Sequence, residues 1–441
     1  MAATIYAPAT AVGRAAIGVI RISGPEAPDV FRALCPGRTL PAPRRATLCR
    51  LYDPADGELL DVAVVIRFAA PQSYTGEEML EIHHHGGLAV SQALLDALGR
   101  LPGLRLAEPG EFTKRAFLAG KLDLTEAEAV ADLVAATTRA QARLALSQLD
   151  GALGRLCRRW REQIIAALSR IEAEIDFGAE EGDVPEDMRR EVLALAAELR
   201  QSIASHLADQ RRGERLRAGV TVAIVGPPNV GKSSLLNRLA RREVAIVTPI
   251  PGTTRDPLEV ALDLDGLPVV LVDTAGLRES PDPVEAEGVR RARERAERAD
   301  LRLHLLDPFI PASAWPEEDP CGLLVVNKVD LAPPPASPRP FLAISCRTGA
   351  GLAQLEARLR ERAAELVGSG DVAVITRARH REALSEALDA LARVAADGES
   401  CELALLAEEL RIAARALGRV VGEIGVEDLL DRIFAEFCIG K

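Results

Sequence analysis

The chain has 441 residues, a formal net charge of −11, and 48% hydrophobic and 27% charged residues. This length is too great for one hydrophobic core and predicts two to four domains of ordinary globular composition. The negative charge argues against a protein that holds nucleic acid by bulk electrostatics, so any RNA contact must be local or shared with a partner.

The composition also bears on location and redox chemistry. No apolar run approaches the roughly 20 residues that span a bilayer, and the first ten residues lack the basic and apolar regions of a signal peptide. We therefore expect a cytoplasmic protein with no membrane contact. The seven cysteines are scattered, odd in number and lack a C-x-x-C pair, which indicates neither a disulfide framework nor a zinc site.

Residues 1–118 are expected to form an α+β domain. Segments 15–23 and 61–68 are strand-like, and the apolar residues at positions 62, 64, 66 and 68 alternate onto one face. Glu81, His83 and His85 would also share one face of a strand. That trio raises a metal site as an alternative interpretation, although no fourth ligand is evident.

From residue 119 the pattern becomes that of a helical bundle. Thr125 and Glu128 fit a capping box, and apolar residues at helical spacing continue from 149 to 175. Further helices are predicted at about 186–212, 379–396 and 403–424. The most basic segments, 155–161 and 211–217, are interpreted as solvated helix faces. We expect a discontinuous helical domain (119–216 and 368–441) into which a Ras-like P-loop G domain (217–367) is inserted.

The first motif of that inserted domain is a phosphate-binding loop. The run Gly226-Pro-Pro-Asn-Val-Gly231-Lys232-Ser233 follows an apolar strand and opens a helix, so its backbone N–H groups can converge on phosphates. Lys232 would reach the β- and γ-phosphates, and Ser233 would bind Mg²⁺. In the motif 273–276, Asp273 would lie beside the Mg²⁺ and Gly276 would offer an N–H near the γ-phosphate.

The later motifs identify the base. Asn327-Lys328-Val-Asp330 follows the strand 323–326, and guanine offers Asp330 two adjacent donors, N1–H and the 2-amino group, which adenine lacks. The loop Ser345-Cys346-Arg347 fits the last guanine contact. The sequence therefore predicts GTP rather than ATP.

Hydrolysis needs an oriented water molecule and a positive charge near the transition state. Leu277 follows the 273–276 motif and cannot orient water, so another group must do so. In the loop 248–256, Thr254 is a plausible second Mg²⁺ ligand. The carbonyl groups of that loop could surround a monovalent cation, with Asn229 completing the ring.

Taken together, these features resemble the MnmE (TrmE) family of tRNA modification GTPases, which act at the wobble uridine. The resemblance covers nearly the whole length. The motifs that carry it, besides those of the G domain, are Arg21-Ile-Ser-Gly, Tyr74-Thr-Gly-Glu-Glu, Glu81 with His85-Gly-Gly, Pro109-Gly-Glu-Phe-Thr-Lys-Arg-Ala-Phe, Gly120-Lys121-Leu-Asp-Leu, and Phe437-Cys-Ile-Gly-Lys441.

The resemblance implies a K⁺-activated GTPase that works as a homodimer. It implies that K⁺ couples hydrolysis to G-domain pairing and that Glu285 orients the attacking water. The K⁺ ligands would be Asn229, Thr248, Ile250 and Thr253, and the Mg²⁺ ligands Ser233 and Thr254. Candidate catalytic residues are Glu285, Asn229, Thr254 and Gly276. The GTP-binding set is Asn229, Val230, Gly231, Lys232, Ser233, Ser234, Thr248, Thr253, Thr254, Asp273, Gly276, Asn327, Lys328, Asp330, Ser345, Cys346 and Arg347.

The resemblance also implies a one-carbon tetrahydrofolate, in the 5,10-methylene or 5-formyl form, on the N-terminal domain. Its contacts would be Arg21, Glu81, Lys121 and Lys441. An FAD-dependent partner of the MnmG type would join the chain in a heterotetramer or larger assembly. Together they would build a 5-carboxymethylaminomethyl group, or another aminomethyl-type group, on uridine 34 of certain tRNAs.

Three alternatives stay open at this point. Cys438 could be a nucleophile on the uracil ring or an inert thiol. The chain could be a non-catalytic RNA-binding switch of the ribosome-assembly kind, although no appended KH-like module is evident. It could also be a folate-dependent one-carbon transferase that GTP merely regulates.

Overall fold

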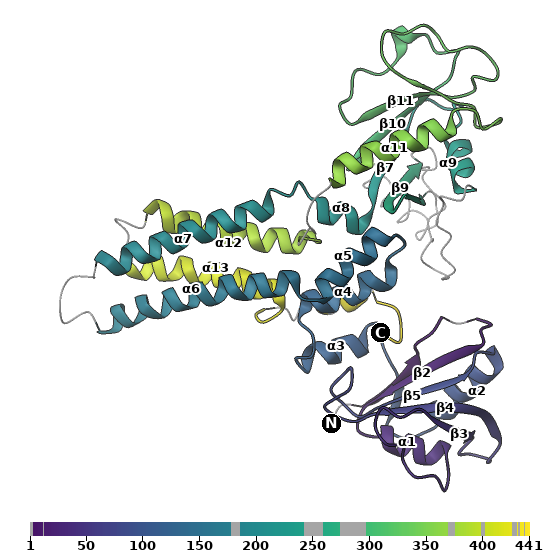
Figure 1. Cartoon of the computed structure of the whole chain (residues 1–441), viewed down its shortest axis with the longest axis vertical. Helices are drawn as coiled ribbons and strands as arrows, with labels where there is room; N and C mark the ends of the chain where they lie inside the picture. The colour runs from purple at the N-terminus through teal and green to yellow at the C-terminus, as the bar shows by residue number, and fades with distance from the viewer. Residues whose placement is uncertain are drawn as a thin grey trace, which may run out of the picture. The chain divides into compact units, whose positions relative to one another are not determined.

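A computed structural model describes residues 3–11, 13–177, 186–241, 259–273, 297–368, 375–397, 402–425, 430, 433–435 and 437–441. The chain divides into two compact units, Met1–Ala131 with Gly418–Lys441 and Asp132–Leu417 (Figure 1). Among the described residues, no helix is both long and apolar enough to cross a membrane.

The first unit is built on a six-stranded sheet with the strand order β3-β4-β5-β2-β1-β6. Neighbouring strands are antiparallel except β1 and β6, which are parallel. Helices α1 (Ala27–Leu34) and α2 (Leu88–Gly99) cover one face, where Phe31, Ile82 and Leu94 are almost completely buried. The strands are β1 (Thr4–Pro8), β2 (Ile17–Ser23), β3 (Thr47–Tyr52), β4 (Leu59–Phe68), β5 (Met79–His85) and β6 (Leu104–Leu106).

Strand β4 alternates as predicted. The face that packs beneath α1 and α2, however, is not the face that carries most of the large apolar side chains. The apolar residues at positions 62, 64, 66 and 68 are half-buried or exposed. Ala63 and Val65, on the other face, are 2% and 1% exposed and belong to the core beneath α1 and α2. The strand therefore leaves an apolar face on the side of the sheet from which Arg21 and Glu81 project, because their positions pair with Ile66 in register.

The residue that caps helix α4 (Leu124–Ala135) differs from the one that was predicted. Asp123, rather than Thr125, caps the helix: its Oδ1 accepts from the backbone N–H of Glu126 at 2.8 Å, and Glu126 Oε2 accepts from the N–H of Asp123 at 2.7 Å. Thr125 instead donates its hydroxyl to Asp123. The predicted Thr125–Glu128 box was therefore wrong by two positions, because a carboxylate that precedes the threonine satisfies the same free N–H groups.

The C-terminal residues complete this unit. Phe434 and Phe437 cluster with Leu124 of α4 and with Phe117 of α3 (Glu111–Leu118). Gly440 has φ +95°, and a Cβ there would lie 2.1 Å from the carbonyl oxygen of Pro8. The tail therefore passes directly against β1, which only glycine permits at this position.

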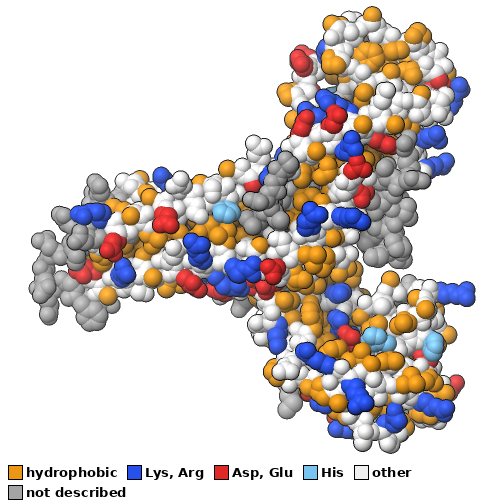
Figure 2. Space-filling model, in the orientation of Figure 1, with side chains coloured by type: hydrophobic (Ala, Val, Ile, Leu, Met, Phe, Trp, Pro, Cys, Tyr) orange, Lys and Arg blue, Asp and Glu red, His pale blue; other side chains and the backbone are white. Residues whose placement is uncertain are grey.

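The second unit contains a helical bundle in which long helices lie side by side (Figure 1). Gly151, with φ +77°, separates its first two helices. In the second of these helices, Leu153, Trp160, Ile164 and Ile171 are buried at helical spacing as predicted, whereas Ile175 at the end of the predicted stripe is 39% exposed. The helices are α5 (Arg139–Leu149), α6 (Ala152–Phe177), α7 (Glu186–Leu207), α12 (Ala378–Asp397) and α13 (Leu403–Val421). In Figure 2, basic and acidic side chains are interspersed along the visible bundle.

The G-domain part of this unit is a six-stranded sheet with the order β12-β11-β10-β7-β9-β8, parallel except between β8 and β9. Apolar residues of the strands and of helices α9 and α11 form one core, for example Ile224, Leu235, Leu303 and Leu355. The elements are β7 (Val220–Val225), α9 (Lys232–Ala240), β8 (Glu259–Leu264), β9 (Leu267–Asp273), β10 (Leu301–Leu306), β11 (Gly322–Val326), β12 (Leu342–Ala343) and α11 (Leu352–Val367), with a short 3₁₀ helix at Ala312–Ala314.

The basic segment 211–217 lies mainly on helix α8 (Arg212–Ala218) and is not the solvated face that was predicted. Arg212 donates to the carbonyl of Val367, and Arg215 Nε donates to Asp300 at 2.7 Å. Arg217 Nε donates to Asp132 at 2.8 Å. These hydrogen bonds therefore hold α8, the helix that leads into β7, in place.

Candidate nucleotide site and N-terminal pocket

The phosphate-binding loop joins the buried strand β7 to α9. Gly226 has φ +155°, and a Cβ there would lie 2.1 Å from the carbonyl oxygen of Leu305. Gly231 has φ +103°, and a Cβ there would lie 2.5 Å from Nδ2 of Asn327. Both glycines are therefore required by close approach as well as by conformation. This geometry turns the chain so that α9 begins at Lys232, with its N-terminus open to an anion.

The polar side chains at the start of α9 contact the phosphate-binding loop and the end of the neighbouring strand β9. Lys232 is 8% exposed, and its Nζ lies 2.7 Å from the carbonyl oxygen of Gly226 and 2.8 Å from that of Pro227. Ser233 Oγ donates to Asp273 Oδ2 at 2.6 Å. Because Asp273 ends the neighbouring strand β9 and is 2% exposed, a hydroxyl and a carboxylate meet at the carboxyl edge of the sheet. This donor set fits Mg²⁺ next to a phosphate.

The predicted base-binding residues also lie together. Ser345 Oγ donates to Asp330 Oδ1 at 2.6 Å, and Arg347 Nε lies 3.0 Å from Asp330 Oδ2. The hydrogen bond from Ser345, together with the charge of Arg347, holds the pKa of the Asp330 carboxyl below its ordinary value. Asp330 is therefore an ionised acceptor, as recognition of two guanine donors requires.

Asn327 connects the base motif to the phosphate loop. Its Nδ2 donates to the carbonyl oxygen of Val230 at 2.8 Å, and its Oδ1 accepts from the N–H of Cys346 at 3.1 Å. Lys328 Nζ lies 2.5 Å from the carbonyl oxygen of Asn229. Burial raises the pKa of the Cys346 thiol to about 11, so this cysteine is a packed, neutral group. The structure thus brings Asn229, Val230 and the residues 231–234, 273, 327–330 and 345–347 to one edge.

The remaining G-domain predictions lie outside the described residues. They are Thr248, Ile250, Thr253, Thr254, Gly276 and Glu285. Asn229 is described, and its backbone is left-handed with φ +64°.

A second polar site lies on the face of the N-terminal sheet opposite α1 and α2, beside the buried cluster that contains Ile5, Met79 and Phe112. Arg21 donates from Nε and Nη2 to Glu81 Oε1 at 3.1 and 3.0 Å, and both side chains are 17% exposed. The guanidinium carbon lies 5.5 Å from the ring centroid of Tyr74 and 5.7 Å from that of Phe112. Both aromatic rings thus lie within cation–π distance of the Arg21 guanidinium.

The C-terminal tail reaches this site. Arg21 Nη1 donates to the carbonyl oxygen of Gly440 at 3.5 Å, and the N–H of Phe112 donates to the carbonyl oxygen of Lys441 at 3.2 Å. Burial, together with the charge of Arg21, lowers the pKa of Lys441. Arg21, Glu81 and Lys441, from opposite ends of the chain, are therefore brought together.

The other two residues with predicted roles in this unit, Lys121 and Cys438, are both exposed. The Cε of Lys121 lies 3.6 Å from where a Cβ on Gly76 would be, beside the loop that carries Tyr74. Of the alternative trio, His83 Nε2 lies 3.4 Å from Glu81 Oε2, whereas His85 Nδ1 pairs with Asp61 Oδ1 at 2.7 Å. In the described part of the chain, no cluster of three or more His, Cys, Asp or Glu side chains could hold a metal ion.

Three residues near this site, Tyr74, Phe112 and Arg115, had no binding role predicted from the sequence. The first two stand within the motifs Tyr74-Thr-Gly-Glu-Glu and Pro109-Gly-Glu-Phe, and aromatic residues beside an arginine motif are a usable signal. Arg115 gives no such signal, because a surface helix commonly carries arginine.

Two models of known families match the chain. The MnmE helical domain matches residues 124–438, and the GTP-binding protein TrmE N-terminus matches residues 4–121. A tRNA modification GTPase MnmE of Methylobacterium sp. (strain 4-46) is 54% identical over 445 residues, covering 100% of both chains. That of Parvibaculum lavamentivorans is 54% identical over 445 residues, covering 99% of this chain and 100% of the relative. Among solved structures, the G domain of the T. maritima FeoB iron transporter is 26% identical with a TM-score of 0.24, covering 34% of this chain and 99% of that one.

Proposed function

Because the chain belongs to the MnmE family of tRNA modification GTPases, we propose that it binds and hydrolyses GTP in the modification of the wobble uridine, position 34, of certain tRNAs. The observation that carries this proposal is the shared sheet edge at which Lys232, Ser233–Asp273 and Asp330 lie. Phosphate, metal and guanine ligands at one edge are the set that GTP hydrolysis requires.

Each side chain has a distinct part in this chemistry. Lys232 neutralises charge on the β- and γ-phosphates, and Asp330 selects guanine because its ionised carboxyl accepts two adjacent N–H groups. Mg²⁺, held by Ser233 and Thr254, would supply positive charge between the phosphates. Asp273, hydrogen-bonded to Ser233, orients that hydroxyl.

Activation by K⁺ is the next part of the proposal, and it rests on the family resemblance. Asn229, with Thr248, Ile250 and Thr253, would hold K⁺, while the Gly276 N–H would contact the γ-phosphate. Glu285 would orient the attacking water in place of the missing glutamine. The position of Asn229, three residues before Lys232 in the loop, supports this part.

We further propose that the polar site around Arg21 and Glu81 takes a one-carbon tetrahydrofolate. A pterin presents paired N–H donors that suit Glu81, and the anionic glutamate tail suits Arg21, Lys441 and Lys121. The support is the convergence of Arg21, Glu81 and Lys441 on the face of the sheet opposite α1 and α2.

The assembly completes the proposal. A cytoplasmic homodimer would work with an MnmG-type FAD protein, which supplies the redox chemistry. The domains would be 1–118 for folate, 119–216 with 368–441 for the helical domain, and 217–367 for GTP. Changes between the GTP and GDP states would then bias the helical domain.

The test is GTP hydrolysis at fixed ionic strength with K⁺ or Na⁺ as the only monovalent cation. Oligomeric state is followed in parallel with GDP–aluminium fluoride. Much faster hydrolysis in K⁺, with G-domain pairing, is expected. Equal rates in both salts would refute K⁺ activation, whereas GTP binding without hydrolysis in either salt would favour the non-catalytic switch. Replacing Glu285 with alanine should slow turnover and leave nucleotide affinity nearly unchanged.

A further inference from the structure

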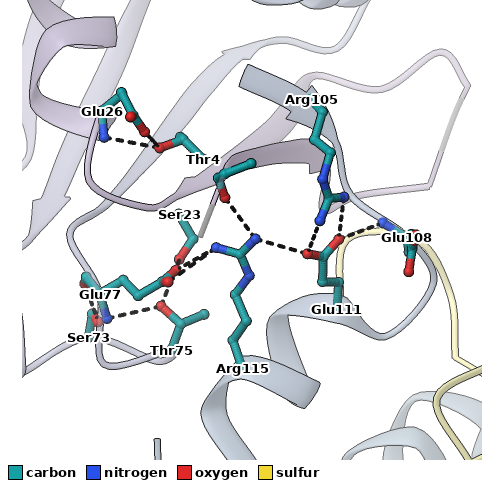
Figure 3. Close-up of polar contacts among 11 residues, drawn as sticks. Thr4, Ser23, Glu26, Ser73, Thr75, Glu77, Arg105, Glu108, Glu111 and Arg115 are labelled. Carbon is teal, nitrogen blue, oxygen red and sulfur yellow. Dashed lines mark hydrogen bonds and ion pairs between the residues drawn. The ribbon is translucent and has the colours of Figure 1, made fainter. Parts of the chain in front are cut away.

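Arg115 of helix α3 joins three segments of the N-terminal unit (Figure 3). Its Nη1 donates to Glu77 at 2.9 and 3.2 Å, and its Nη2 donates to Glu111 at 2.9 Å and to the carbonyl oxygen of Ala3 at 2.8 Å. The side chain is 12% exposed. One guanidinium therefore links the start of β1, the loop 73–77 and the first turn of α3.

The loop and the helix that Arg115 connects are the two that carry the aromatic rings around Arg21. Tyr74 belongs to the loop, and Phe112 belongs to α3. Their ring centroids lie 5.5 and 5.7 Å from the guanidinium carbon of Arg21. The width of this aromatic clamp is thus set by the separation of the loop from the helix.

Polar contacts on either side of Arg115 make that separation rigid. Glu77 Oε2 also accepts from Ser23 Oγ at 2.6 Å, and Ser23 lies two residues after Arg21 on β2. Tyr74 OH lies 2.9 Å from Thr113 Oγ1, a second link between loop and helix. The contacts of Arg115 and of its partner Glu77 thus reach β2, which carries Arg21, and the loop and α3, which carry the two aromatic rings.

Glu111 is in turn held on its other side. Arg105 donates to its two carboxylate oxygens at 2.8 and 2.5 Å, and the N–H of Glu108 donates to Oε2 at 3.0 Å. Although burial opposes ionisation, the hydrogen bonds from Arg105, Glu108 and Arg115 lower the pKa of Glu111 to about 2. Glu111 therefore stays charged and can anchor Arg115 throughout the physiological range.

We infer that Arg115 is a positioning residue of the tetrahydrofolate pocket, which acts through Glu77 and Glu111 to hold Tyr74 and Phe112 in place around Arg21. The inference rests on the folate part of the proposed function. Arginine suits this role because its planar fork reaches three acceptors at once, which the single ammonium of lysine cannot do with the same geometry.

The experiment measures the Kd of 5-formyltetrahydrofolate by titration calorimetry on the full chain, beside the melting temperature. Arg115→Gln is expected to weaken binding roughly tenfold, a size typical of residues coupled through one hydrogen-bond network. Arg115→Lys should recover part of the affinity. The comparison variant is Arg105→Gln, which also removes a positive partner of Glu111 but leaves the link from Arg115 to Glu77 in place. Its Kd should rise by less than that of Arg115→Gln.

A double-mutant cycle separates positioning from general loss of stability. If Arg115 acts through the Tyr74 ring, Arg115→Gln should have little further effect on Kd in a Tyr74→Leu background, although it should still lower the melting temperature there. Glu77→Gln provides a second way to weaken the same link if Arg115→Gln does not fold, and a roughly tenfold weaker Kd is expected for it too.

The outcomes distinguish the two levels of the proposal. Wild-type chain that does not bind 5-formyltetrahydrofolate would refute the folate site itself. Wild-type binding with an unchanged Kd in Arg115→Gln and Glu77→Gln would refute the positioning role alone. An equal loss of affinity in Arg105→Gln, or independent effects of Arg115 and Tyr74 on Kd, would also overturn it.

Discussion

The connections into and out of the G domain are tied to one carboxylate, and removing its charge should destabilise the second unit. Asp132 Oδ1 accepts from Arg217 Nε at 2.8 Å, just before β7, and from Arg377 Nη2 at 2.8 Å, just before α12. The three side chains are 15%, 30% and 12% exposed. Asp132→Asn keeps the shape of the side chain but removes the negative charge that faces the guanidinium groups of Arg217 and Arg377.

The magnitude follows from those contacts. A hydrogen bond to a charged group contributes about 1.5–3 kcal/mol, and partial exposure here favours the lower end of that range. Two such bonds give a loss of about 3 kcal/mol. At about 2–4 °C per kcal/mol for a large domain, the melting temperature of this unit should fall by about 6–12 °C.

The assay is thermal melting followed by tryptophan fluorescence. Both tryptophans of the chain, Trp160 and Trp315, are buried in the second unit, so the signal reports on that unit. The matched control is Glu172→Gln, which removes a similar two-bond pair with Arg411 at a site where the side chains are 43% and 34% exposed. A surface pair of this kind should contribute less than about 1 kcal/mol. Equal shifts in the two variants would refute the reasoning.

Three further changes have definite expected outcomes. Gly226→Ala places a Cβ 2.1 Å from the carbonyl oxygen of Leu305 in a positive-φ position, so GTP affinity should fall by about 100-fold or more in a titration with a fluorescent nucleotide, while folate binding persists. Asp330→Asn should weaken GTP binding by about 100-fold and improve binding of xanthosine triphosphate, because the amide can donate to the extra carbonyl; competition titration measures both. Glu111, whose pKa is lowered from 4.5 to about 2, stabilises the fold above pH 4.5. Solvent screening keeps this contribution below about 3 kcal/mol, and it disappears as the pH falls towards 2. Glu111→Gln should therefore be less stable than the wild type at pH 7, with the difference shrinking below pH 4 in denaturant titrations.

The described residues of the nucleotide edge could be located from the sequence because each part of that edge is local. A strand, a glycine turn and a helix N-terminus are contiguous from Val220 to Ala240, and the base motif is one strand-to-loop segment. Parallel strands bring their carboxyl ends to one edge, so motifs far apart in the chain had to meet there. Hydrophobic periodicity likewise located α12 and α13 within a few residues.

The contacts that the sequence did not reveal are those between segments without a repeating pattern. Arg212, Arg215 and Arg217 read as a solvated basic stretch, and only the structure shows that their partners lie 155, 85 and 85 positions away. The cap at Asp123 was missed for a local reason, since several carboxylates near one helix start fit the same pattern. The buried face of β4 depended on which side the helices cover, a tertiary choice that alternation leaves open.

The two ion pairs of Asp132 affect how the G domain would act on the helices. A single flexible linker would let the sheet reorient without stressing the bundle. Here Arg381 adds a second link, because it contacts Asp209 at 2.6 Å and Glu214 of α8 at 2.6 Å. Any nucleotide-dependent shift of the sheet must therefore displace α8 and the start of α12 together, so the proposed change between GTP and GDP states would reach the bundle through two coupled connections.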